Sequence, residues 1–167
     1  MSRTKSRKEL EEEGVYLNGP IVPEWFKPKC DGCSVPKGIR WAMKANQGHA
    51  PCVIHDWKYF VIPLAYSPNN IMREHERIKA DYELKINRGM VAKNRVFGKL
   101  FGMFYFRGVR IGGKRAITKS KLGIIDKSPN TIDEINELNK HIEKYYPDYD
   151  DLWFKFLIRE MRIKVDG

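Results

Sequence analysis

The sequence predicts a mainly α-helical protein with a small helical core, short strands or an extended N-terminal segment, and a C-terminal helical hairpin. Apolar residues recur at helical spacing in several segments after residue 50, whereas residues 15–41 are rich in proline and glycine. A hydrophobic content of 42% favours a folded globule. No apolar run approaches the roughly 20 residues that cross a bilayer, so we expect no transmembrane segment.

Three parts are expected along the 167 residues. Residues 1–14 form a charged, flexible arm, residues 15–121 form the core domain, and residues 122–167 form the C-terminal helical hairpin. The N-terminus lacks the apolar stretch of a secretory signal, and three cysteines are an odd number that offers no disulfide framework. We therefore expect synthesis in a reducing cytoplasm.

The first two helices are expected on either side of a proline-containing turn. The first runs from about residue 51 to 62, because Pro51 suits a first helical turn and Pro63 stops the helix. The second spans about residues 71–88 and ends at Gly89 as a C-cap. Its predicted buried stripe consists of Ile71, Ile78, Tyr82 and Ile86.

Three further helices follow in the prediction. An aromatic helix covers about residues 92–106, and a capping box at Thr131-x-x-Glu134 opens a fourth helix that ends at Tyr146-Pro147. A last helix covers about residues 150–163. The residues predicted to face inward in these last two helices are Ile132, Ile135, Leu138, Ile142, Trp153, Phe156, Leu157 and Met161.

Candidate chemistry lies in residues 52–59, which read C-V-I-H-D-W-K-Y. On a helix, Cys52, His55 and Tyr59 share a face, whereas Asp56 points about a quarter turn away. His55 can then act as a general base on water while Asp56 holds a cation. The alternative is a histidine near a helix N-terminus that is bonded to a backbone carbonyl.

Asp81 is the candidate partner of His55. It lies at the edge of the predicted buried face of the second helix, where a carboxylate usually needs a partner. If the first two helices pack antiparallel, Asp81 can accept the second ring proton of His55 and fix its tautomer. The alternative is a solvent-facing carboxylate paired with Lys85.

Two exclusive metal sites are compatible with the sequence. In the first, a polar turn at Asp31, Gly32 and Ser34 supplies oxygen ligands for calcium beside Asp56. In the second, C-x₂-C-x₁₈-C-x₂-H has the spacing of a zinc site, and a zinc-bound imidazole cannot act as a base. The zinc ligands would be Cys30, Cys33, Cys52 and His55.

The remaining histidines are assigned by position. His49 precedes the first helix and is a candidate to line the same cleft, whereas His75 and His141 are predicted to be surface residues.

A basic segment accounts for the net charge of +10. Residues 85–121 hold eleven Lys or Arg and no Asp or Glu, and the rest of the chain is close to neutral. Such a segment favours an anionic partner: phospholipid, nucleic acid or an acidic protein surface. The predicted anion-binding residues are Arg107, Arg110, Lys114 and Arg115. The alternative is an ordinary solvated surface.

The motifs of residues 29–115 resemble a small family of tailed phages and prophages that is catalogued as a domain of unknown function. The shared pattern is D-x-x-S-V-P, H-D-x-x-Y, A-D and a final Y…V-R-x-G. It falls on Asp31, Ser34, Val35, Pro36, His55, Asp56, Tyr59, Ala80, Asp81, Tyr105, Val109, Arg110 and Gly112. The resemblance implies a phage or prophage protein, and its cysteine positions differ from those common in that family.

A more distant resemblance concerns mechanism. C-x-x-H-D-x-x-Y, followed by an aspartate on the next helix, is similar to the catalytic helices of secretory phospholipases of the A-two class. That resemblance implies that His55 activates water, Asp56 binds calcium, Asp81 orients His55 and Tyr59 supports Asp81. The departure is that Cys30-Asp-Gly-Cys-Ser stands in place of a glycine-rich calcium loop.

Three functions are therefore expected as alternatives. The first is a calcium-assisted, phospholipase-like ester hydrolase. The second is a non-enzymatic virion component, a tail or head-associated protein that docks through its basic surface on other phage structural proteins. The third is a zinc-stapled nucleic-acid-binding protein.

Overall fold

The computed structural model describes residues 5–30, 50–92 and 127–166, together with Leu100, Met103, Phe106 and Arg107. Within these ranges the chain is mostly helical and contains no strand, which confirms the predicted fold class. The elements are α1 (Arg7–Glu12), the short 3₁₀ helix η1 (Lys27–Lys29), α3 (Ala50–Ala65), α4 (Ile71–Val91), α7 (Ile132–Tyr145) and α8 (Asp151–Asp166). None of these helices combines the length and the apolarity needed to cross a bilayer.

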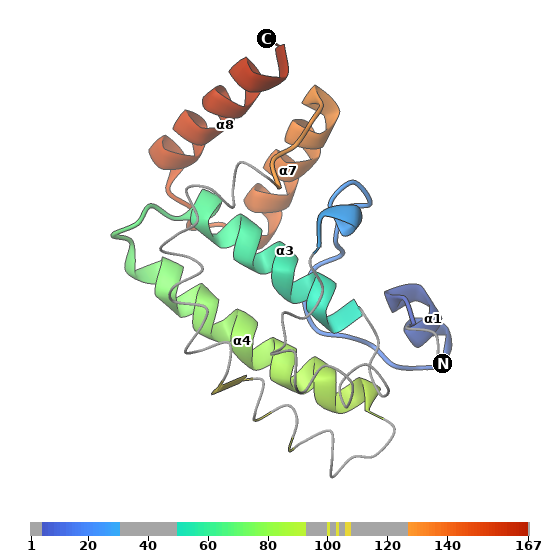
Figure 1. Ribbon diagram of the computed structural model, residues 1–167. Coiled ribbons are helices and arrows are strands. Elements are labelled where there is room, and N and C mark those ends of the chain that lie inside the picture. Colours follow the sequence, from blue (N-terminus) through green and yellow to red (C-terminus); the bar gives the residue numbers. More distant parts are fainter. Residues whose placement is uncertain are drawn as a thin grey trace, which may run out of the picture.

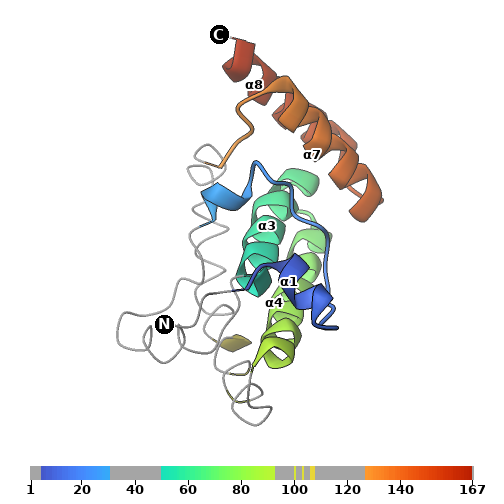
Figure 2. The same ribbon diagram turned by 90° about the vertical axis from the view of Figure 1, so that its right-hand side faces the viewer.

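Helix α3 is the centre of the fold. It packs side by side with α4, and the hairpin of α7 and α8 lies against α3 on another side (Figures 1 and 2). Because only five residues connect α3 to α4, the two helices run antiparallel, as predicted. The middle of α3 is an aromatic cluster in which Trp57 and Phe60 meet Trp25 and Phe26 at centroid distances of 4.8–6.3 Å.

The N-terminal segment is extended and fastened to the α3/α4 pair. Within the predicted arm, α1 has a capping box at Ser6 and Glu9, and Leu10 is buried. Asn18 and Asn87 of α4 bind each other, from Asn18 N to Asn87 Oδ1 at 2.8 Å and from Asn87 Nδ2 to Asn18 O at 2.9 Å. Gly19 has φ +102°, and a Cβ there would lie 2.7 Å from Ile54 Cγ2, so this approach requires glycine.

Both α3 and α4 are longer than predicted. Helix α3 continues through Pro63 to Ala65, although the proline lacks the N–H for one backbone hydrogen bond. Pro63 is buried, and its carbonyl accepts the Trp153 Nε1 proton at 3.0 Å, so tertiary contacts stabilise this turn. Helix α4 continues past Gly89 to Val91, and the buried side chain of Arg88 anchors this last turn. Contacts distant in sequence thus override local stop signals.

The face of α4 that packs against α3 is polar, so the predicted apolar stripe was wrong. Ile71, Ile78 and Tyr82 are exposed. The buried residues of α4 are instead Arg77, Ala80, Asp81, Leu84, Asn87 and Arg88. Burying a charged side chain is costly unless it is paired, and in this face Arg77 pairs with Asp81. This arrangement creates the candidate site described below.

The C-terminal hairpin has the predicted connectivity. Thr131 caps α7, since its hydroxyl accepts the Glu134 N–H at 3.2 Å, but the Glu134 carboxylate binds Asn130 N and not Thr131 N. The buried residues are Ile135, Leu138, Ile142, Phe154, Ile158 and Met161. Ile132 and Phe156 are exposed, contrary to the prediction, because the inward face of α8 is set by the spacing of Phe154, Ile158 and Met161.

His141 is buried, contrary to the prediction of a surface residue, while His75 is exposed as expected. The His141 Nε2 atom accepts the Trp57 Nε1 proton at 2.8 Å, and this hydrogen bond connects α7 to the middle of α3. Burial, followed by the nearby charges of Lys144 and Lys58, lowers the pKa of His141 to about 4. The neutral imidazole is therefore part of the folded core.

We expect acid to destabilise the protein through His141. The folded pKa of about 4 lies below the ordinary 6.5, so between these pH values the unfolded chain binds a proton that the folded chain does not. The stabilisation is complete above pH 6.5 and is lost as the pH falls toward 4, by about 3 kcal/mol in all. Urea unfolding of the parent at pH 7 and 4.5 measures this loss.

The matched variants are His141→Gln and His75→Gln. Glutamine at 141 keeps an acceptor for Trp57 and does not titrate, so the pH dependence should shrink, whereas the exposed His75 should contribute little. An unchanged pH dependence in His141→Gln would contradict the prediction.

Candidate active site

The α3/α4 interface brings His55 and Asp81 together as the sequence predicted. The His55 Nε2 atom lies 3.0 Å from Asp81 Oδ1. The face of α3 that carries His55 also carries Cys52 and Tyr59, and all three side chains meet α4: the Cys52 Sγ atom accepts the Arg88 Nη2 proton at 2.8 Å. The helical spacing therefore placed the correct face of α3 against α4.

The tautomer of His55 follows from the burial of Asp81. An ionised carboxylate only accepts hydrogen bonds, so the proton of this contact resides on His55 Nε2 and the Nδ1 atom carries a lone pair. Among the described residues, none donates a hydrogen bond to Nδ1. The His55 side chain is 10% exposed, while Asp81 is fully buried. One ring edge is thus fixed in the protein, and the other is able to accept a proton.

Two further donors fix the Asp81 carboxylate. The Tyr59 hydroxyl donates to Asp81 Oδ1 at 2.5 Å, and Arg77 Nη1 donates to Asp81 Oδ2 at 3.1 Å. Burial, and then the negative charge of Asp81, raise the pKa of Tyr59, so its hydroxyl stays a donor. The His55 and Tyr59 rings also stack at a centroid distance of 4.2 Å.

Arg77 is shared between two carboxylates. Besides Asp81, the guanidinium binds Glu74, from Nε to Oε2 at 2.7 Å and from Nη2 to Oε1 at 2.6 Å. This second ion pair is the largest cause of the raised pKa of Arg77. The guanidinium therefore links the buried Asp81 to the exposed Glu74.

The sequence interpretation missed Arg77 and Glu74. The spacing Glu74-x-x-Arg77-x-x-x-Asp81 is an i, i+3 and i, i+4 arrangement on one side of a helix, and it was the available signal. It was hidden because a search for apolar periodicity assigns charged positions to the solvent.

The other predicted site residues are only partly within the described residues. Asp56 lies on α3 and is half-buried. Several predicted residues lie outside the described residues: the calcium ligands Asp31 and Gly32, the zinc ligand Cys33, His49, and the anion-binding Arg110, Lys114 and Arg115. Of the predicted anion-binding residues, Arg107 is described, and it is exposed. In the part of the chain that the structure describes, no group of three or more His, Cys, Asp or Glu side chains is placed to hold a metal ion.

The sulfur chemistry differs from the expectation. Cys52 forms a disulfide bond, so the prediction that the cysteines pair in no disulfide was wrong; an odd count excludes complete pairing but not a single bridge. The Cys30 thiol donates to the Phe26 carbonyl at 3.7 Å. A sulfur within a disulfide has no thiolate to offer a zinc ion, which speaks against the predicted zinc set.

Tyr59→Phe is expected to lower the free energy of unfolding by about 2 kcal/mol, the usual range for a hydrogen bond to a charged group. The substitution removes one of the described donors to the buried Asp81 carboxylate, and it keeps the ring that stacks with His55. Tyr82→Phe on α4 is the control, because the Tyr82 side chain is exposed. Urea unfolding of both variants provides the comparison. Equal losses in the free energy of unfolding would show that the hydrogen bond from Tyr59 to Asp81 does not stabilise the protein.

Neither a scan against protein-family models nor searches of the curated proteins and of the solved structures find a match for this chain. The functional argument therefore rests on the geometry of the α3/α4 interface.

Proposed function

We propose that this protein is an ester hydrolase in which His55 acts as a general base on water. The observation that carries the proposal is the contact of His55 Nε2 with the fully buried Asp81, which leaves Nδ1 as the basic atom of the ring. The His55 side chain is 10% exposed, so the ring is not completely closed off from solvent.

In the proposed reaction, His55 Nδ1 takes a proton from a water molecule as its oxygen attacks the ester carbonyl. The tetrahedral intermediate then expels the alcohol, and the imidazolium returns the proton to the leaving oxygen, so that water and ester give acid and alcohol. Asp81 holds the ring and compensates the transient positive charge, as an orienting carboxylate does in hydrolytic triads. Tyr59 and Arg77 keep the Asp81 carboxylate in place.

Calcium is proposed as the cation of this reaction. The donor types fit a hard ion, since Asp56 is a carboxylate and the predicted turn at Asp31 and Gly32 contributes oxygen ligands. When bound, such an ion would polarise the substrate carbonyl. Of these residues, Asp56 lies within the described residues, on α3 next to His55.

The substrate class and setting rest on the two resemblances. The proposed substrate is a phospholipid or a related ester, and the basic segment 85–121 is proposed to hold the protein at an anionic partner. Phage or prophage origin, with synthesis in the host cytoplasm, belongs to the same proposal.

The test is a hydrolysis assay on the purified full chain. Short-chain phosphatidylcholine and p-nitrophenyl butyrate are incubated with calcium or with EGTA, and released acid is titrated. We expect acid release with calcium and a strong loss with EGTA. Release that is insensitive to EGTA would remove calcium from the proposal, and no release from either ester would overturn the hydrolase assignment.

A further inference from the structure

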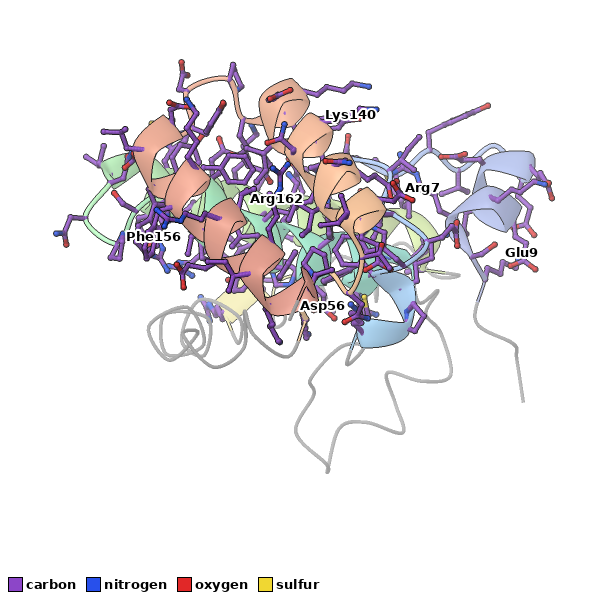
Figure 3. All side chains as sticks on the ribbon, turned by 90° about the horizontal axis from the view of Figure 1, so that it is seen from above. Arg7, Glu9, Asp56, Lys140, Phe156 and Arg162 are labelled. Atoms are coloured by element: carbon purple, nitrogen blue, oxygen red, sulfur yellow. The ribbon has the colours of Figure 1, made fainter. Side chains whose placement is uncertain are left out.

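The outward face of α8 carries a stripe of apolar side chains. Leu152, Phe156 and Ile163 are 82%, 53% and 60% exposed. Their spacing of four and seven residues places them on one line along the helix, opposite the buried line of Phe154, Ile158 and Met161. Figure 3 views the hairpin from this side, with Phe156 labelled on α8. Apolar groups thus occupy the centre of the face that is directed away from the core.

Cations border this stripe on the side of α7. Lys155, Arg159 and Arg162 follow one another at helical spacing, and Figure 3 shows Arg162 on the α7 side of α8. Lys155 pairs with Asp151 at 2.7 Å, whereas Arg159 and Arg162 form no hydrogen bond or ion pair with any residue that the structure describes. Glu160 lies on the opposite flank of the helix. Two guanidinium groups are therefore available to an external anion.

A hollow of about 420 Å³ lies between α7 and α8, beside the two arginines. Its floor is apolar, from Phe154 and Ile158, and its rim carries Arg159, Arg162 and Asn139. Lys155 and Ile163 also line the hollow. Because Asn139 donates to Glu143 at 2.8 Å and Lys155 pairs with Asp151, Arg159 and Arg162 are the lining cations without a described ion pair. A space of this kind suits a phosphate group that is attached to an apolar chain.

We propose that α8 binds the surface of a bilayer that contains anionic phospholipid. Leu152, Phe156 and Ile163 enter the boundary between head groups and acyl chains, and Arg159 and Arg162 bind lipid phosphates. An apolar stripe bordered by cations is the usual composition of a helix that lies in a membrane interface. A stable protein interface usually needs about 20–30 residues on each side, many more than this stripe contains. A bilayer accommodates a single apolar stripe without a complementary surface.

This surface is separate from the candidate active site. Helix α8 contacts α3 on a different side from α4, where His55 and Asp81 lie (Figure 1). The inference therefore goes beyond the hydrolase proposal and stands or falls without it.

Vesicle co-sedimentation of the full chain tests the proposal. Vesicles of pure phosphatidylcholine are compared with vesicles that contain about 30% phosphatidylglycerol, at low salt and again at high salt. We expect binding to the anionic vesicles that weakens with salt. Each cation near such a surface contributes about 1 kcal/mol, so R159Q/R162Q should weaken binding about 25-fold. L152S/F156S should weaken it about a hundredfold, because each apolar side chain that enters the bilayer contributes about a factor of ten.

Matched variants separate α8 from the rest of the basic chain. K27Q/K79Q removes two exposed cations on η1 and α4, and Ile71→Ser removes an exposed apolar side chain from α4. Both controls should bind within about twofold of the parent, because the field of the surface falls off within a Debye length. All substituted positions are exposed, and far-UV circular dichroism checks the fold. The proposal is overturned if the parent does not bind anionic vesicles, or if the α8 variants bind as their controls do.

Discussion

Replacing His55 with alanine is expected to reduce the rate of ester hydrolysis at least about a hundredfold, the lower end of what a positioned general base contributes. The substitution removes the only ring whose Nε2 is fixed by Asp81 and whose Nδ1 has no donor among the described residues. Calcium binding and substrate binding should change less than the rate, because in the proposed reaction His55 acts on the water. Initial rates at saturating substrate measure the effect.

His75→Ala is the matched control, since His75 is an exposed histidine on α4. Its rate should equal that of the parent. His55→Gln serves as a second variant that fills more of the space, so a loss of rate in both variants with a retained melting temperature separates chemistry from folding. Hydrolysis at the parental rate in His55→Ala would end the assignment of His55 as the base.

Arg77→Met is expected to lower the free energy of unfolding by about 3–5 kcal/mol, the usual loss when one member of a buried ion pair is removed. Asp81 would remain fully buried without its contact to Arg77, and Glu74 would lose its two hydrogen bonds with the guanidinium. Methionine retains much of the apolar volume of the arginine stem, so packing alone explains little of the loss. Urea unfolding at neutral pH measures it.

Lys79→Met provides the comparison on the same helix. Lys79 is exposed and lies 3.5 Å from Glu76, a surface pair that should contribute less than about 1 kcal/mol. The double variant R77M/D81N should regain part of the stability lost in Arg77→Met, because it also removes the negative charge that Arg77 compensates in the parent. A loss in Arg77→Met no greater than in Lys79→Met would show that the cluster contributes nothing to stability.

Helical spacing predicted the mainly α fold, the antiparallel pair and the C-terminal hairpin. The ends of α3 and α4 were misplaced because Pro63 and Gly89 are local stop signals that distant contacts override. The buried face of α4 was also misassigned. Apolar periodicity selects isoleucines, whereas this helix buries Arg77 and Asp81 and exposes Ile71. Whether two charged side chains pair and are buried together depends on the folded structure, and a hydropathy pattern does not reveal it.

The site was predictable where the chemistry required particular side chains. The H-D-x-x-Y motif identified His55 and Tyr59, and an aspartate on the next helix completed the contact. Arg77 and Glu74 were missed because the search considered partners of Asp81 on α3, whereas Arg77 contacts Asp81 and Glu74 contacts Arg77 within α4. His141 was missed because its partner Trp57 lies 84 residues away, a separation that no local pattern reveals.

That separation determines when the core can be completed on the ribosome. The Trp57 indole emerges long before His141 is synthesised, so α3 and α4 leave the exit tunnel with an aromatic side chain that still lacks its acceptor. Ile135, Leu138 and Phe154 cover the same region, and all of them arrive late. Until these residues emerge, part of the apolar surface of α3 stays uncovered, and chaperones usually engage exposed apolar surface of this kind.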